Sequence, residues 1–414
     1  MPKHKWKFKS HFRREAYGWK GTALASKRMR EAVSEIKKVA KKDPSLAAEG
    51  VIGLFCPLYP ALMQIDSSSG ALGTAMNKTI EALMPILIKA DWDMNTRGKW
   101  LDKLYEAIQE DGWGTFDNLR NYWGEICVYP GLAHIWADRL LPTVKQVWIS
   151  ESYSYFVGSD MCLSCLLYTE RHDELHELLQ LQDKPFWHYN EFWGKALVKQ
   201  GKYEEALYYA HQIRSQMTVN NEERSMDLFC ESVLIKAGRI EEAYEKYGLN
   251  IPSYGTCLNI YRAICKKYPT IDKRKILLDC IDRTSEKGKW FASAKSAGFL
   301  DIALECAHSS GANPDVLLRA SRDFAQRDID FSLQVGIQAI MALLTETFYE
   351  EVTKADVAIA YEDVEKIAGE NGKLEEFREQ LGREMLKRSC KPHLRQIVVR
   401  ILAREKRSEV DFPQ

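Results

Sequence analysis

The feature that most constrains the fold is the segment 193–210, WGKALVKQGKYEEALYYA. Its apolar residues recur with helical spacing before and after Gly201, which indicates a helix, a tight turn and a second helix. Each of these helices has one apolar face, so an isolated pair cannot bury both faces and needs neighbours of the same kind. The segment therefore predicts a stack of antiparallel helix pairs.

The phrase formed by the turn and the start of the second helix recurs along the chain. Its five copies are Glu170–Leu175, Gly201–Ala206, Gly238–Ala243, Gly298–Ala303 and Gly372–Phe377. The first three steps are 31, 37 and 60 residues, and the long step predicts a further pair near Pro269–Leu277. A spacing of about 34 residues is typical of stacked helical hairpins. Glycine at the turn predicts a left-handed helix C-cap, and alanine five positions later allows close helix packing.

The N-terminal part of the chain shows helical periodicity as well. We expect helices over residues 23–42, 45–56, 71–90, 96–111, 115–127, 132–149 and 159–167. Asp66 or one of the serines 67–69 is the expected N-cap of the third. Hairpin signals between alternating runs are absent from the sequence. The predicted fold is all-α: an α-solenoid of stacked antiparallel helix pairs with an irregular period.

The composition along the chain predicts four regions. They are a basic aromatic arm at 1–22, an N-terminal helical domain at 23–158, helical repeats at 159–382, and a basic C-terminal helix and tail at 383–414. The arm shows no helical periodicity and is expected to be extended.

Two repeat phrases, LVKQGKYEEALYYA and LIKAGRIEEAYEKY, resemble the tetratricopeptide repeat. Gly201 and Gly238, with Ala206 and Ala243, stand at the small-residue positions of that family, and the resemblance covers roughly residues 160–310. The whole chain, with phrases such as EAVSEIKKVAKKDP and GKWFASAKSAG, is also similar to an uncharacterised bacterial protein family. The tetratricopeptide resemblance implies a curved stack whose concave face binds a peptide or a protein partner.

Charge is strongly segregated although the net charge is zero. Residues 1–44 carry 14 Lys and Arg against four acids, and residues 383–407 carry nine against two, so the middle of the chain is acidic. The candidate contact residues for nucleic acid or another anion are Lys5, Lys7, Lys9, Arg13 and Arg14 in the arm, and Lys27, Arg30, Lys37 and Lys41 along the first helix. The last four form a stripe about 80° wide on a helix.

Three interpretations of this basic region stay open. Cations interleaved with Trp6, Phe8 and Phe12 suit nucleic acid, because phosphates pair with Lys and Arg while unpaired bases stack on rings. Alternatively, the stripe is a solvated face and the rings pack on the first helices. In the third interpretation the basic region docks on the acidic part of this protein or on an acidic partner.

One group of residues has metal-ligand spacing. Cys162 and Cys165 are followed by His172 and His176, and each pair can share a helix face, as zinc ligands do. The repeat register aligns these residues with Trp193, Ala196, Tyr203 and Leu207, which favours core packing. The histidine pair also lacks the glutamate of the H-E-x-x-H metalloprotease motif. The segment 67–74 lacks the lysine of a phosphate-binding loop.

The expected function is therefore non-enzymatic, without cofactor or metal. We expect a scaffold that binds a protein or peptide partner on its concave face, with Lys195, Lys199 and Glu231 as candidate groove residues. The alternative is a nucleic-acid-associated accessory protein that uses the arm and the first helix. Ten cysteines without an export signal predict reduced thiols in the cytoplasm, and no apolar run is long enough to span a membrane.

Overall fold

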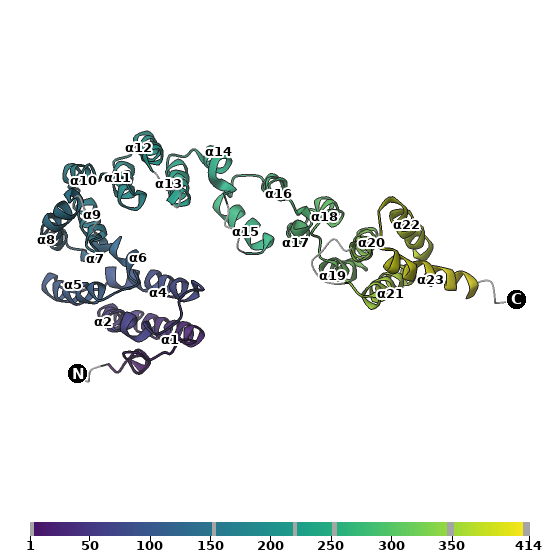
Figure 1. Cartoon of the computed structure of the whole chain (residues 1–414), viewed down its shortest axis with the longest axis horizontal. Helices are drawn as coiled ribbons and strands as arrows, with labels where there is room; N and C mark the ends of the chain where they lie inside the picture. Colours follow the sequence, from purple (N-terminus) through teal and green to yellow (C-terminus); the bar gives the residue numbers. More distant parts are fainter. Residues whose placement is uncertain (1–3, 151–154, 218–221, 251–254, 346–351, 409–414) are drawn as a thin grey trace. The chain divides into compact units, whose positions relative to one another are not determined.

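The computed structural model describes residues 4–150, 155–217, 222–250, 255–345 and 352–408. These residues form 23 α-helices and no strand, which confirms the predicted all-α class of packed helix pairs (Figure 1). Residues 1–3 of the predicted arm, 151–154 of the predicted N-terminal domain and 409–414 of the predicted tail lie outside the described residues. The chain divides into two compact units, Met1–Ala237 and Gly238–Gln414, which we describe one at a time.

The first unit is built from helices that pack mainly on their neighbours in the sequence. Its helices are α1 Thr22–Ala40, α2 Pro44–Phe55, α3 Leu58–Leu62, α4 Ala71–Ile88, α5 Met94–Gln109, α6 Asp117–Arg120, α7 Trp123–Cys127, α8 Pro130–Ile149, α9 Ser159–Tyr168, α10 His172–Leu179, α11 Trp187–Lys199, α12 Tyr203–Gln216 and α13 Glu223–Lys236. Helix α1 contacts α2 and α4, α8 contacts α9, and α11 contacts α12. The pair α11–α12 is the one that the segment 193–210 predicts.

Two details of the first unit differ from the prediction. The N-cap of α4 is Gly70, in the left-handed region at φ 69°, and not Asp66 or a serine. The expected helix 115–127 is two short helices, α6 and α7. The Ser164 hydroxyl enters the break between them: it donates to the Asn121 carbonyl at 3.0 Å and accepts the Gly124 N–H at 3.0 Å. A side chain inserted into the helical ladder interrupts it.

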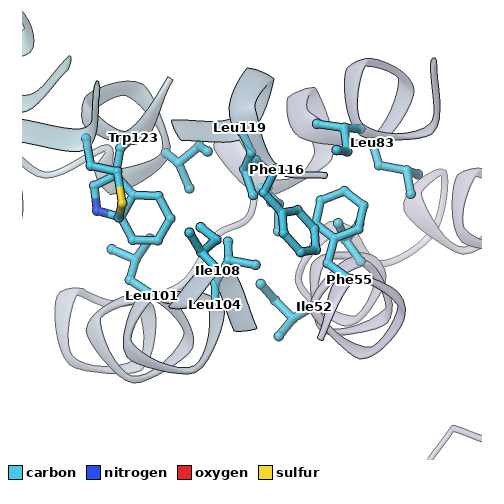
Figure 2. Packing of buried hydrophobic residues seen from close by; sticks show 14 of the residues in the cluster. Ile52, Phe55, Leu83, Leu101, Leu104, Ile108, Phe116, Leu119 and Trp123 are labelled. Atoms are coloured by element: carbon cyan, nitrogen blue, oxygen red, sulfur yellow. The ribbon is translucent and has the colours of Figure 1, made fainter. Parts of the chain in front are cut away.

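The core of the first unit runs continuously between these helices. Figure 2 shows the part between α2, α4, α5, α6 and α7, where apolar side chains from several helices converge. Phe55 packs on Phe116 with their ring centroids 6.0 Å apart, and Trp123 meets Trp136 edge-on at 5.2 Å. Aromatic pairs in such tilted arrangements stabilise beyond the area they bury.

A buried arginine joins three helices of this core. Arg97 in α5 is only 1% exposed, and its guanidinium donates to the carbonyl oxygens of Leu87 at 3.0 Å, Ala90 at 2.6 Å and Ile126 at 2.9 Å. These carbonyls lie at the C-terminal ends of α4 and α7, where helical carbonyls lack intrahelical partners. A cation is also favoured there by the helix dipole. Arg97 is therefore a structural cap.

The repeat turns have the geometry that their glycines predict. Gly201, Gly238, Gly298 and Gly372 all lie in the left-handed region, with φ between 68° and 83°. In three of these turns the next N–H bonds a carbonyl five residues earlier: Lys202 to Leu197 at 2.9 Å, Phe299 to Ala294 at 3.1 Å and Lys373 to Ala368 at 2.8 Å. This is the Schellman motif that closes helix C-termini. Glu170 occupies the same position at φ 58° without being glycine.

The basic residue after the turn has a role that the sequence pattern alone did not reveal. Its side chain forms an ion pair with a glutamate three residues later in three copies of the phrase: Arg171 with Glu174 at 2.6 Å, Arg239 with Glu242 at 2.6 Å and Lys373 with Glu376 at 3.3 Å. The pair spans the first turn of the second helix, where a carboxylate is favoured by the helix dipole.

The second unit continues the same construction. Its helices are α14 Ile240–Ala243, the π-helical turn η3 Tyr244–Gly248, α15 Cys257–Lys267, α16 Lys273–Asp282, the 3₁₀ turn η4 Lys287–Trp290, α17 Phe291–Ala297, α18 Leu300–Ala307, α19 Pro314–Phe324, α20 Ile329–Thr345, α21 Lys354–Glu370, α22 Leu374–Lys387 and α23 Pro392–Ser408. The pair α15–α16 stands where the long repeat step predicts a further pair. Helix α20 is central, since it contacts α18, α19, α21 and α22. None of the helices in the described ranges is long and apolar enough to cross a membrane.

Candidate binding sites

The N-terminal segment is folded onto the first helices, so the prediction of an extended arm is wrong. Residues Lys7–His11 form a 3₁₀ helix, η1, that contacts α1 and α2. The buried rings are Trp6, Phe8, Phe12 and Tyr17, with exposed fractions between 2% and 7%. The Trp6 ring lies so close to Gly50 in α2 that a Cβ atom there would be 2.4 Å from it. Rings packed in this way are not available to stack on bases.

The cations of this segment, in contrast, lie on the surface. We call the nine residues Lys5, Lys7, Lys9, Arg13, Arg14, Lys27, Arg30, Lys37 and Lys41 the basic surface; all of them are exposed. Of these nine residues, only Arg14 forms an ion pair with another described residue, a 3.9 Å contact with Glu15. The structure thus brings the predicted cations of the arm and of α1 together on neighbouring elements.

The acids of the same region are already engaged. The Glu31 carboxylate accepts a hydrogen bond from Arg28 at 2.7 Å, which is the main reason that its pKa is lowered. Glu35 accepts the backbone N–H groups of Lys7 at 2.9 Å and Phe8 at 3.3 Å. Asp43 caps α2 by accepting the Leu46 N–H at 2.9 Å. Because Glu31, Glu35 and Asp43 bond groups other than the nine cations, those cations stay exposed to a partner, and residues 1–44 keep an excess of 14 cations over four acids.

The predicted groove residues of α11 and α13 do not form an open site. Lys195 is partly buried, pairs with Glu191 at 3.1 Å and lies 5.3 Å from the centre of the Phe192 ring. Lys199 is exposed near the end of α11. Glu231 is only 3% exposed, so it offers no surface to a partner. The expectation for Glu231 fails because it faces the helix packing and not the outside of the stack.

Of the residues with metal-ligand spacing, the two cysteines lie in the core and the two histidines are partly buried. Cys162 and Cys165 are fully buried, and burial raises the pKa of Cys162 to about 12, which holds its thiol neutral. Zinc requires the thiolate. The His172 Nδ1 is 3.2 Å from the Gln200 amide nitrogen, and the His176 ring stacks at 4.5 Å on Trp193. Across the described ranges no three His, Cys, Asp or Glu side chains converge as metal ligands would.

The second unit contains a polar cavity that sequence reasoning missed. It has a volume of about 310 Å³ and lies between the end of α18, the middle of α20 and the C-terminal half of α22. Its lining consists of His308, Gln334, Ile337, Gln338, Gln380, Arg383, Glu384 and Lys387. The signal that could have revealed it is Gln338, a polar residue inside the apolar run VGIQAIMALL of α20.

Some polar groups around this cavity have partners and others do not. Glu384 is shared by Lys387 at 2.9 Å and Arg388 at 3.6 Å, and the Lys387 hydrogen bond is the main cause of its lowered pKa. Arg388 also contacts the Nδ1 atom of His308 at 3.0 Å. Partial burial, followed by the charge of Arg388, lowers the pKa of His308. Gln338 is only 3% exposed, and its buried Oε1 atom has no hydrogen-bond partner among the described residues.

Comparison with known proteins adds no functional assignment. No protein-family model matches the chain, and no curated protein sequence matches it. Function therefore has to be inferred from the surfaces and the cavity described above.

Proposed function

We propose that the chain is a non-enzymatic helical-repeat scaffold whose basic surface binds an acidic protein or peptide partner. The observation that carries the proposal is the imbalance within residues 1–44: the cations are exposed while Glu31, Glu35 and Asp43 are engaged locally. The sequence-based expectation placed the partner on a concave face. The proposal moves it to the basic surface because Lys195 and Glu231 are engaged or buried.

The dimensions of α1 suit a peptide-sized contact. From Lys27 to Lys41 the helix rises about 21 Å, at about 1.5 Å per residue. An extended acidic peptide of about six residues spans the same length. Individual exposed ion pairs contribute only about 0.2–1 kcal/mol each, so affinity depends on several pairs forming together. Such a contact weakens strongly with salt.

The test is a binding measurement on the full chain with a defined probe. A fluorescent poly-glutamate peptide is titrated with the wild type and with a variant that replaces Lys27, Arg30, Lys37 and Lys41 by Gln. The matched control replaces Lys89, Lys145, Lys184 and Lys202, four exposed lysines elsewhere in the first unit, by Gln. We expect at least about a tenfold loss for the α1 variant and little change for the control.

Two outcomes would contradict the proposal. Equal weakening in both variants would show that only net charge matters, and unchanged binding in the α1 variant would remove the basic surface from the interaction. Deleting residues 1–44 is not a suitable test, because Met29 and Ile36 of α1 belong to the core of the first unit.

Nucleic acid is the second candidate partner, supported by the same exposed cations. Trp6, Phe8, Phe12 and Tyr17 are buried, whereas Trp19 is 67% exposed, so phosphate contacts would dominate and Trp19 is the ring of this segment that a base could reach. If four phosphates are contacted, binding of a DNA duplex should weaken about a hundredfold between about 50 and 200 mM salt. If single-stranded DNA binds more tightly than the duplex, Trp19→Ala should remove the difference, because its ring is exposed. Tighter binding of duplex DNA than of poly-glutamate at equal salt would favour nucleic acid over an acidic protein.

A further inference from the structure

The cavity between α18, α20 and α22 contains a buried polar group that the fold does not use. The buried oxygen of the Gln338 amide has no hydrogen-bond partner in the described part of the chain, and the residue lines the cavity. A buried amide without a partner destabilises a protein, whereas an apolar side chain of the same shape would not. Gln338 therefore costs stability unless water or a ligand in the cavity hydrogen-bonds its oxygen.

The other lining groups supply mainly donors. A guanidinium can only donate, so the Arg388 contact requires His308 Nδ1 to accept, and His308 Nε2 then carries the proton. Arg383 makes only a 3.8 Å contact with the exposed Glu379 side chain and a 3.4 Å bond to the Glu379 carbonyl. Most of its five donors therefore remain free.

The charges around the cavity also favour a negative ligand. Among the residues that line the cavity, Arg383 and Lys387 are cations and Glu384 is the carboxylate, while the lowered pKa of His308 favours its neutral imidazole. The balance is positive, and Glu384 already shares its oxygens with two cations. A cavity of about 310 Å³ is at the small end of the range for ligand pockets. It fits a small molecule and not a folded partner.

We propose that this cavity binds a small organic anion through its carboxylate or phosphoryl oxygens. Arg383 and Lys387 would pair with the charge, and the Gln338 amide and the Nε2–H group of His308 would hydrogen-bond the ligand. This site lies entirely in the second unit. It is independent of the basic surface, so either proposal can fail without the other.

The test titrates the full chain with sodium succinate and, separately, with inorganic phosphate, against sodium chloride at matched ionic strength. Calorimetry measures affinity, and NMR follows the His308 ring among the nine histidines. We expect saturable binding with a Kd of about 1 mM or tighter for at least one of the two probes. The bound anion should raise the pKa of His308, because it opposes the effect of Arg388. Succinate binding alone assigns a carboxylate ligand, and phosphate binding alone assigns a phosphoryl ligand.

Three variants separate a binding role from a structural one. Arg383→Gln should weaken the probe at least about tenfold, whereas Arg319→Gln, an exposed arginine of α19 in the same unit, should leave binding unchanged. Gln338→Met keeps the side-chain length and should also weaken binding while leaving the Tm equal or higher. The proposal is overturned if neither probe binds saturably, if Arg319→Gln weakens binding as much as Arg383→Gln, or if Gln338→Met lowers the Tm and leaves binding intact.

Discussion

Two glycines ten residues apart, on either side of the same helix start, allow a sharp test of the repeat-turn geometry. Gly372 precedes α22 in the left-handed region at φ 68°, and Gly382 lies inside α22. A Cβ atom built on either residue meets nothing within 4 Å. Replacement by alanine therefore creates no clash at either position, and only the backbone conformation distinguishes the two.

The two substitutions should have opposite signs. Gly372→Ala forces a residue with a Cβ atom into the left-handed region, which costs about 1–2 kcal/mol. Gly382→Ala replaces a poor helix former by the best one and should stabilise α22 by about 0.8–1.0 kcal/mol. The difference of about 2 kcal/mol corresponds to about a 30-fold difference in the opening equilibrium of the helix.

Hydrogen exchange of the α22 amides is the suitable assay, because two compact units make a single global free energy of unfolding ill-defined. Gly372→Asn should fall between wild type and Gly372→Ala, since asparagine tolerates the left-handed region better than other side chains. If Gly372→Ala leaves exchange unchanged, or if Gly382→Ala speeds it, the left-handed turn does not limit stability as we argue.

Three further predictions concern the first unit and are measured by hydrogen exchange of the affected helices. Glu170→Gly should stabilise the protein by about 0.5–1 kcal/mol, because glycine adopts the positive φ of this residue without strain. The same change at Glu177, which is exposed and helical, should destabilise it by about 1 kcal/mol. If both changes shift stability in the same direction, Glu170 is not strained. Arg97→Met should destabilise by at least about 3 kcal/mol, because three buried carbonyls lose their donor, and a loss below about 1 kcal/mol would contradict its capping role. The Arg171 hydrogen bond lowers the pKa of Glu174, so its stabilisation is present above the unfolded-state pKa and is lost as pH falls through the folded one. Glu174→Gln should therefore be less stable than wild type at pH 7, and the difference should vanish once the pH is below the folded-state pKa of Glu174; a difference that persists there would show that charge is not the cause.

The helix pairs could be predicted from the sequence because their signals are local. Apolar spacing on both sides of Gly201 and a glycine at the turn are set by residues within one or two helical turns of each other. The break between α6 and α7 could not be predicted, since it depends on Ser164, 43 residues after Asn121. Periodicity alone gives one helix over 115–127, and only the packed structure places a hydroxyl inside it.

The candidate binding surface could be predicted only in part. The sequence identifies the cations of residues 1–44, but their availability depends on what the acids do. Glu35 is occupied by the amides of Lys7 and Phe8, which are 28 and 27 residues away. The N-terminal segment folds onto α1 and buries Trp6, Phe8, Phe12 and Tyr17, while Trp19 stays exposed. Long-range packing therefore removes most of the stacking surface that the nucleic-acid hypothesis needs, and no local pattern reports this.

Arg97 and Gln338 show how the structure separates a polar residue that the fold needs from one that it does not. Both are almost fully buried, but only Gln338 stands out in the sequence, inside an apolar run, because Arg97 belongs to an amphipathic helix with other charged residues. The terminal nitrogens of Arg97 donate to three carbonyls at the helix ends that it caps, although its Nε has no partner among the described residues. Gln338 has a buried oxygen without a partner in the same part of the chain, and it borders a cavity rimmed by Arg383 and Lys387. A buried polar group without a protein partner destabilises the fold. The search for a ligand of this protein should therefore begin at Gln338.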